Sequence, residues 1–192
     1  MTKTLYLMRH GQTLFNKRHR IQGWCDAPLT DLGVYQAQVA GQYFKNAGIT
    51  FDAAYSSTSE RACDTLEIVT NGSLPYQRVK GLKEWNFGTF EGESEDLNPP
   101  LPYEDFFVTY GGESQDQVRE RMAATILQLM QETKGKSVLM VSHGGAMANF
   151  ARAWEDNWRL DNLGHMTNCG ILKFSFEDDQ FYLEEAIGHD FS

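Results

Sequence analysis

Residues 3–11 are Lys-Thr-Leu-Tyr-Leu-Met-Arg-His-Gly, and this stretch is the strongest indication of the fold. Its first six residues form a short run rich in strand-forming side chains, and the polar Arg-His-Gly follows directly. This pattern is typical of a buried strand that passes into a loop. Residues 137–145 repeat it as Ser-Val-Leu-Met-Val-Ser-His-Gly-Gly. In both stretches, a histidine and a glycine come at the end of an apolar strand.

Strand and helix patterns alternate along the rest of the chain. The expected strands cover residues 3–8, 51–56, 137–142, 170–176 and 181–187, and the expected helices cover residues 30–46, 57–69, 144–157 and a segment after the capping box of Ser114 and Gln117. Residues 11–29 are expected to be loop, and residues 72–113 are the least regular part. Such alternation predicts an α/β fold, a three-layer α/β/α sandwich with a mainly parallel sheet. The last two strands are candidates for an antiparallel edge.

Length and composition exclude several classes of protein. The 192 residues suit a single domain covering residues 1–192, and the net charge of −9 argues against a nucleic-acid partner. The longest apolar runs have only a few residues, so no membrane partner is expected. The first apolar stretch is also too short for a signal peptide. Three widely spaced cysteines make neither a disulfide framework nor a CxxC metal site, which favours a reduced, cytoplasmic protein.

Charged side chains and glycines gather where the expected strands end. Arg9 and His10 follow the first strand, Arg61 lies on the first turn of the second expected helix, and His143 and Gly144 follow a later strand. Open α/β sheets bind ligands beyond the carboxyl ends of their strands. Arginine forks match phosphate oxygens, glycine N–H groups at a helix start bind anions, and histidine can act as a covalent nucleophile. Each residue alone is more typical of packing or of a solvated surface, but together they predict a phosphoryl-transfer site.

Five ordered motifs resemble the histidine phosphatase superfamily, also called the phosphoglycerate mutase-like family. They are residues 7–13 (LMRHGQT), Asn16 with residues 22–30 (QGWCDAPLT), residues 55–65 (YSSTSERACDT), residues 84–92 (EWNFGTFEG) and residues 141–145 (VSHGG). One departure is Thr58, which stands where the family usually has leucine. The resemblance runs from residue 5 to about residue 148, and it implies a phosphoglycerate mutase-like fold.

The resemblance also implies roles for individual residues. His10 would be the nucleophile that forms a phosphohistidine, and Glu84 would give a proton to the leaving group. The implied phosphate-binding residues are Arg9, Asn16, Gln22, Gly23, Arg61, His143 and Gly144. An acid must hold its proton near neutral pH, so the aromatic neighbours Trp85, Phe87 and Phe90 are expected to desolvate Glu84. His143 is expected to stay protonated beside a phosphate dianion.

No metal cofactor is implied, because the arginines and His143 would supply the positive charge. Zinc on the histidines is an alternative, but the family needs none and the sequence has neither HxxxH nor HExxH spacing. The implied partner is a small phosphorylated substrate, and the protein is expected to be a monomer or a homodimer.

The superfamily contains both phosphatases and mutases, and residues 84–118 help to decide between them. This stretch contains no lysine or arginine, and its part from 91 to 105 contains six acidic residues. Residues 89–113 are expected to be a lid insertion that would repel a multiply anionic bisphosphoglycerate and offer aromatic rings to a leaving group. The sequence therefore favours a metal-independent phosphatase.

Two other functions stay open. Lys17, Arg18 and Arg20 could grip a carboxylate, which favours a mutase that uses a bisphosphoglycerate primer. The third hypothesis is a catalytically inactive module that binds phosphorylated ligands. It is the weakest of the three, because the chain keeps both the nucleophile and the acid.

Overall fold

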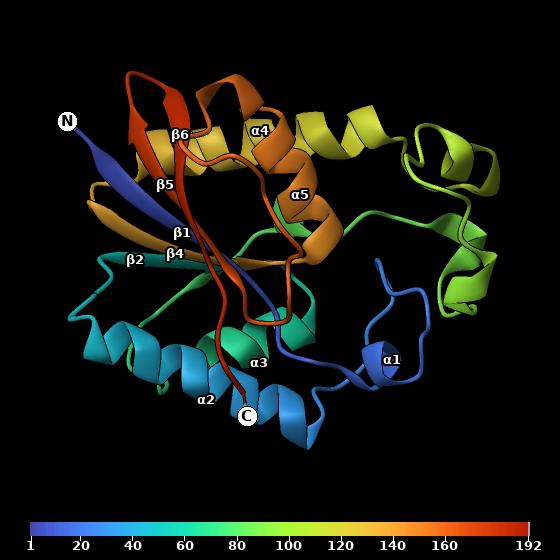
Figure 1. Cartoon of the computed structure of the whole chain (residues 1–192), viewed down its shortest axis with the longest axis horizontal. Helices are drawn as coiled ribbons and strands as arrows, with labels where there is room; N and C mark the ends of the chain where they lie inside the picture. The colour runs from blue at the N-terminus through green and yellow to red at the C-terminus, as the bar shows by residue number, and fades with distance from the viewer. Residues whose placement is uncertain (192) are drawn as a thin grey trace.

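A six-stranded sheet forms the middle of the molecule in the computed structural model, which describes residues 1–191 (Figure 1). Its strands are β1 (Lys3–Arg9), β2 (Ala53–Ser56), β3 (Gln77–Arg78), β4 (Ser137–Ser142), β5 (Ile171–Glu177) and β6 (Gln180–Ile187). They lie in the order β3-β2-β4-β1-β5-β6. The first four are mutually parallel, and β5 runs antiparallel to both β1 and β6. The predicted mainly parallel sheet with an antiparallel edge is confirmed.

Helices cover both faces of the sheet. The α-helices are α1 (Leu14–Lys17), α2 (Asp31–Asn46), α3 (Glu60–Val69), α4 (Gln115–Glu132) and α5 (Gly144–Arg152). Five short 3₁₀ turns span Lys80–Leu82, Gly88–Phe90, Glu95–Leu97, Phe106–Tyr110 and Glu155–Asn157. Figure 1 shows α2 and α3 on one face and α4 and α5 on the other. This is the predicted α/β/α sandwich.

The alternation of side chains along β1 explains the two layers. Leu5 and Leu7 belong to a buried cluster that includes residues of α4 and α5, whereas Tyr6 and Met8 belong to one that includes residues of α2 and α3. Successive strand residues point to opposite faces, so a central strand that is apolar on both sides is covered on both sides. No helix within residues 1–191 is long and apolar enough to cross a membrane.

Three local expectations were wrong. The expected loop at 11–29 contains α1, a single turn capped by Thr13 and Asn16. The stretch 72–113 is the least regular part, as expected, and its one strand, β3, has only two residues, both exposed. The helix expected from residue 57 begins at Glu60, because the Ser57 N–H instead bonds to the carbonyl of Val141 on β4. The helix expected to reach residue 157 ends at Arg152, and the chain then tightens into a 3₁₀ turn.

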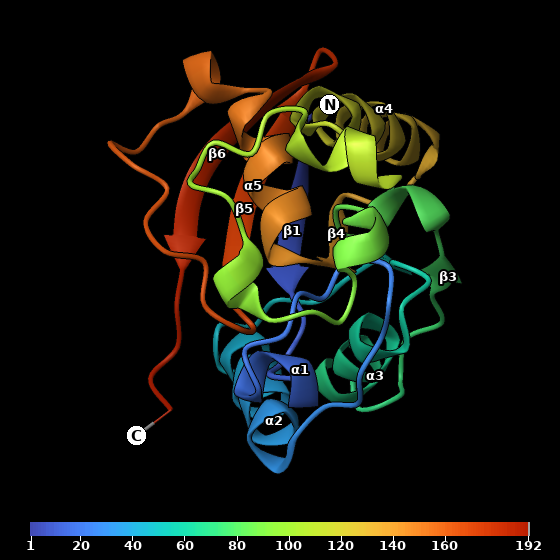
Figure 2. The same ribbon diagram turned by 90° about the vertical axis from the view of Figure 1, so that its right-hand side faces the viewer.

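The carboxyl ends of three neighbouring strands meet at one edge of the sheet. Arg9 of β1 pairs in register with Ser142 of β4, and Ser56 of β2 pairs with Val141. The segments that follow these strands are therefore neighbours in space. Figure 2 looks toward this part of the molecule, where α1 and the segment of residues 86–113 flank the start of α5.

Candidate active site

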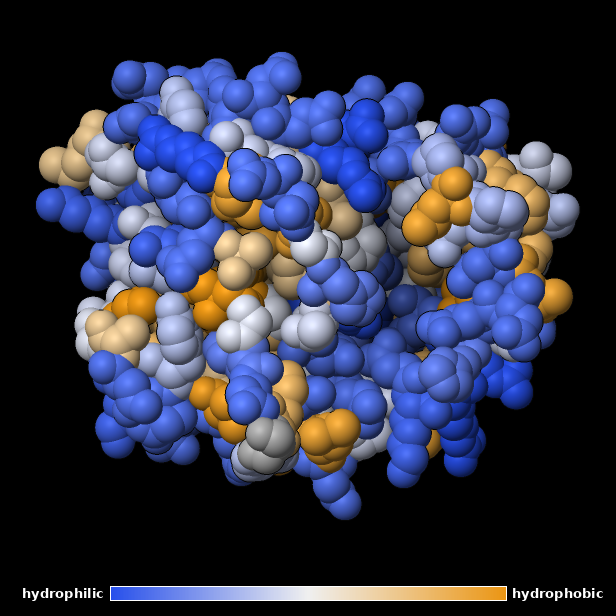
Figure 3. Space-filling view, in the orientation of Figure 1, coloured by the Kyte–Doolittle hydropathy of each residue, from blue (hydrophilic) through white to orange (hydrophobic). Residues whose placement is uncertain are grey.

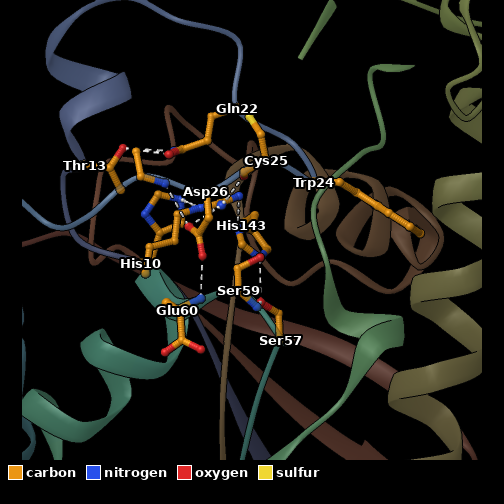
Figure 4. Close-up of polar contacts among 12 residues, drawn as sticks. His10, Thr13, Gln22, Trp24, Cys25, Asp26, Ser57, Ser59, Glu60 and His143 are labelled. Carbon is orange, nitrogen blue, oxygen red and sulfur yellow. Dashed lines mark hydrogen bonds and ion pairs between the residues drawn. The ribbon is translucent and has the colours of Figure 1, made fainter. Parts of the chain in front are cut away.

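Arg61 lies between two histidines at this edge. Its Nε–H points to Nε2 of His10 at 3.3 Å, and its Nη2 lies 3.0 Å from Nδ1 of His143. The two histidine rings are 5.2 Å apart between centroids, and the close-up shows them side by side (Figure 4). All three side chains are buried, with exposures of 3% or less. The structure thus brings together the predicted nucleophile and two of the predicted phosphate-binding residues.

The other donors of Arg61 are held by the loop before α2. Nη1 donates to the carbonyl of Cys25 and to Oδ1 of Asp26, both at 2.8 Å, and Nη2 donates to the carbonyl of Gly23 at 2.8 Å. With the two histidines, these partners account for all five N–H groups of the guanidinium. Oδ2 of Asp26 also accepts from the N–H of Glu60 at the start of α3. Arg61 is therefore fixed in one orientation.

The hydrogen bonds determine which nitrogen of each histidine carries hydrogen. Nδ1 of His10 lies 2.7 Å from the carbonyl of Gly11, which can only accept, so Nδ1 carries the hydrogen and Nε2 keeps its lone pair. Nδ1 of His143 faces an arginine donor, so Nε2 carries the hydrogen and donates to Oγ of Ser57 at 2.7 Å. His10 therefore has the tautomer that a nucleophilic Nε2 requires.

Burial and nearby cations both favour the neutral histidines. Burial, followed by Arg61 and Arg9, lowers the pKa of His10 well below its usual value. Burial and Arg61 likewise lower the pKa of His143, with smaller contributions from His10 and Lys83. In this network the protonated His143 expected from the sequence is therefore disfavoured, although a phosphate dianion would act in the opposite direction.

The carboxylate of Glu84 lies against the first turn of α5. Its Oε1 accepts from the backbone N–H groups of Trp85 at 2.8 Å and Ala146 at 2.7 Å, and Oε2 accepts from Gly145 at 2.9 Å. Backbone N–H groups at a helix start stabilise a carboxylate. The expected apolar surroundings are thus only part of its environment, and the Phe90 ring instead contacts Phe106, Phe107 and Tyr110.

A cavity of about 770 Å³ opens next to this network. Figure 3 shows the surface hollowed between the body of the molecule and the segment on the right. Five predicted site residues line the cavity, namely Arg9, Asn16, Gln22, Glu84 and Gly144, whereas His10, Gly23, Arg61 and His143 lie behind its wall. Arg9 donates from Nη1 to the carbonyl of Met166 at 2.6 Å, and its buried Nε has no hydrogen-bond partner.

Three residues of the site had no role assigned from the sequence. Asp26 and Ser57 hold Arg61 and His143, as described above. Glu91 accepts hydrogen bonds from the backbone of Gly23, Trp24, Cys25 and Phe87 at 2.7–3.0 Å, and so shapes the loop whose carbonyls hold Arg61. All of them stand inside the quoted motifs, but only spatial contacts reveal what they do. As for the zinc alternative, residues 1–191 contain no group of three or more His, Cys, Asp or Glu side chains that could hold a metal ion.

Fold and site together define a class of protein. It is an α/β sandwich in which two histidines and a buried arginine meet at the carboxyl ends of parallel strands, beside a cavity. The chain belongs to the histidine phosphatase superfamily (branch 1), whose family model matches residues 5–187. The resemblance seen in the five motifs is confirmed at the level of the family.

Relatives within the family carry different activities in their names. A 2,3-bisphosphoglycerate-dependent phosphoglycerate mutase of Parvibaculum lavamentivorans is 31% identical over 172 residues, with 77% of each chain covered. A phosphoglycerate mutase structure from Bacillus anthracis superposes with a TM-score of 0.82 at 29% identity, covering 95% of this chain and 92% of that one. A phosphoserine phosphatase from Entamoeba histolytica, in complex with 3-phosphoglyceric acid, has a TM-score of 0.77 at 27% identity, with 97% and 98% covered.

Proposed function

We propose that the protein is a metal-independent phosphomonoesterase that works through a phosphohistidine on His10. The observation that carries this proposal is the tautomer of His10, whose Nε2 lone pair is held toward Arg61 by the bond from Nδ1 to Gly11. Attack by Nε2 forms an N–P bond and breaks the P–O bond to the leaving group. Water then attacks the phosphorus atom, which breaks the N–P bond and releases inorganic phosphate.

Arg9 and Arg61 are the cations that would neutralise the transferred phosphoryl group. Arg9 lines the cavity, and its unpartnered Nε can donate to a phosphate oxygen without losing an existing bond. Arg61 has no unused donor, so its Nε and Nη2 would exchange the histidine nitrogens for phosphate oxygens as the ester binds. Charge-assisted bonds to phosphate are stronger than bonds to a neutral imidazole, which favours that exchange.

Glu84 would be the general acid and base. In the first half of the reaction it gives a proton to the leaving oxygen, and in the second half it takes one from the attacking water, so it ends each cycle as it began. Gly145 and Ala146 hold its two oxygens at the cavity wall. The carboxylate that forms when the proton leaves is stabilised by these donors.

The cavity wall supports hydrolysis of an ester with a sizeable leaving group. Trp85, Phe87 and Tyr103 line it, together with Leu101 and Pro102 from the segment 89–113, which we propose as a lid. Among the six acidic residues between 91 and 105, Glu95 is the one that lines the cavity, and Glu91 is bound to the loop before α2. Repulsion of a bisphosphate by the lid is therefore weaker than the sequence suggested.

Phosphoglycerate mutase is the second candidate. Two curated relatives named as mutases are 31% and 34% identical to the chain, and Arg20 and Arg152 line the cavity and could hold a carboxylate. Interconversion of 3- and 2-phosphoglycerate that depends on a bisphosphoglycerate primer would establish this activity.

Phosphate release from p-nitrophenyl phosphate near pH 6, with EDTA present, tests the proposal. Activity is expected in the wild type and should fall at least about 1,000-fold in His10→Ala and substantially in Glu84→Gln. His19→Asn is the matched control, because His19 is exposed and its φ of 50° suits asparagine. Equal activity in wild type and His10→Ala would refute the phosphohistidine. An inactive wild type would leave two hypotheses, the mutase that needs its bisphosphoglycerate primer and the binding module, and the phosphoglycerate assay would separate them.

A further inference from the structure

One face of α5 lines the cavity beyond the reacting groups. Gly144, Gly145, Ala148, Asn149 and Arg152 all belong to the cavity wall. Gly145 holds Glu84, so this face begins at the proton donor and runs outward. With a rise of 1.5 Å per residue, Asn149 stands about 6 Å and Arg152 about 10 Å along the helix from Gly145. The helix therefore presents side chains at increasing distances from the ester oxygen.

Asn149 has an unused acceptor at the middle of this face. The residue is 2% exposed, and its Nδ2 donates to the carbonyl of Gly145 at 2.9 Å. A carbonyl only accepts, so this bond fixes the amide orientation and leaves Oδ1 as the free end. Oδ1 is buried and has no hydrogen-bond partner. An unsatisfied buried acceptor destabilises the free protein, and a ligand donor would recover that loss.

Arg152 is an unpaired cation at the outer end of the face. Its side chain is exposed and forms no hydrogen bond or ion pair with the described residues 1–191. Of the other exposed arginines, Arg78 pairs with Glu60 and Arg159 pairs with Glu184. Arg18 and Arg20 are exposed and unpaired like Arg152, and Arg20 also lines the cavity, but only Arg152 shares the cavity-facing side of α5 with Asn149. An unpaired guanidinium on a cavity wall matches a planar anion such as a carboxylate.

We propose that Asn149 and Arg152 determine the specificity for the leaving group. The preferred ester, on this view, carries a hydroxyl or amino group that donates to Oδ1 of Asn149 and a carboxylate, farther from the phosphate, that pairs with Arg152. This inference rests on the proposed phosphatase activity and adds the substrate class, a phosphorylated hydroxy or amino acid. The cavity volume of about 770 Å³ favours acids longer than three carbons.

Three six-carbon phosphate esters separate the two contacts. 6-Phosphogluconate has both hydroxyls and a carboxylate, sorbitol 6-phosphate lacks the carboxylate, and 6-phosphohexanoate lacks the hydroxyls. In the wild type, kcat/KM for 6-phosphogluconate is expected to exceed that for each of the others at least about tenfold, as one charge-assisted or recovered bond allows.

Each variant is expected to remove one preference. Arg152→Gln should reduce the preference over sorbitol 6-phosphate to about twofold, and Asn149→Ala should do the same for the preference over 6-phosphohexanoate. The matched control is Lys134→Gln, which removes the same charge from an exposed residue that lies before β4, at the other end of the sheet. It should keep both preferences. Melting curves establish that the variants fold.

The outcomes separate this inference from the proposed function. A wild type that hydrolyses all three esters equally, or preferences that survive both substitutions, would overturn the specificity role and leave the phosphatase intact. If neither these esters nor p-nitrophenyl phosphate is hydrolysed, the proposed function fails. Binding of the same three esters, followed by the fluorescence of the cavity residue Trp85, then decides the inference: tighter binding of 6-phosphogluconate that Arg152→Gln abolishes supports it, and equal binding overturns it.

Discussion

The inner network of His10, Arg61 and His143 and the outer cavity wall differ in how many of their polar atoms have hydrogen-bond partners. Behind the wall, every N–H of Arg61 has a protein partner, and both histidines have both nitrogens engaged. On the wall, Nε of Arg9 and Oδ1 of Asn98 and of Asn149 have none. The difference indicates that the protein itself holds His10, Arg61 and His143 in place, whereas these wall atoms are left for a ligand to satisfy.

This difference predicts unequal effects of substitution in the two regions. A fully bonded network loses several interactions when one member changes, so substitutions there should affect both folding and turnover. Substitution of a wall residue whose polar atom has no partner should cost the free protein little stability. The following predictions test that contrast, from the largest effect to the smallest.

The largest effect is expected for Arg61→Lys. Lysine keeps the charge but offers three donors from one point, so it cannot join His10, His143 and the carbonyls of Gly23 and Cys25 together. Turnover of p-nitrophenyl phosphate should fall at least about 100-fold, and the melting temperature should drop. Arg159→Lys, at an exposed arginine, is the control. If both variants behave alike, the inner network is not the rigid unit described here.

Gly23→Ala is expected to destabilise the inner region through backbone contact. A methyl group on Gly23 would lie 2.0 Å from the carbonyl oxygen of Trp85, so the loop that holds Arg61 must move. Denaturant unfolding should show a loss of roughly 2–4 kcal/mol, as overpacking in a tight site does. Gly188→Ala is the matched control, since a Cβ there meets nothing within 4 Å. Equal stability of the two variants would contradict the close approach.

The buried histidines predict a loss of stability in mild acid. The pKa of His10 and of His143 is lowered in the folded protein, so the unfolded chain binds more protons once the pH falls below about 6.5. Their contribution to stability is complete above that pH and decreases as the pH falls toward the folded values, by roughly 1–3 kcal/mol between pH 7.5 and 5.5. Urea midpoints at these pH values measure it. His143→Asn should flatten the profile, and an unchanged profile would argue against a neutral, buried His143.

The smallest effect is expected for Ser57→Ala. It removes the acceptor for Nε2 of His143 but leaves the bond from Arg61 to Nδ1. We expect a loss of about 1 kcal/mol in stability and a few-fold decrease in kcat, measured by unfolding and by phosphate release. Ser73→Ala, at an exposed serine in a turn, controls for the hydroxyl itself. A decrease as large as that of Arg61→Lys would show that Ser57 has a larger part in the network.

Much of the fold could be predicted from the sequence because its central elements have strong periodic patterns. The apolar runs of β1 and β4 and the capping box of α4 are local signals, and all three elements lie where the sequence placed them. By contrast, β3 exists only because Gln77 and Arg78 pair with β2, and neither residue is buried. A two-residue strand with both side chains exposed is too short and too polar to give a periodic signal.

The candidate site shows the same limit. His10, Arg61 and His143 could be gathered from the sequence because each follows the end of a neighbouring parallel strand. The contributions of Asp26 and Glu91 could not be predicted, since Asp26 holds Arg61, 35 positions away, and Glu91 holds Trp24, 67 positions away. Charge type alone cannot distinguish a carboxylate that holds a loop from one exposed to solvent.

The pairing of β1 has a consequence for synthesis of the chain. β1 is the first strand to be made, yet its two partners in the sheet are β4 and β5, whose residues begin at Ser137 and Ile171. During translation the apolar segment before His10 must therefore wait until most of the protein has emerged from the ribosome. A nascent chain released early would expose this segment to chaperones and proteases, so an incompletely synthesised copy would lack the sheet that positions His10.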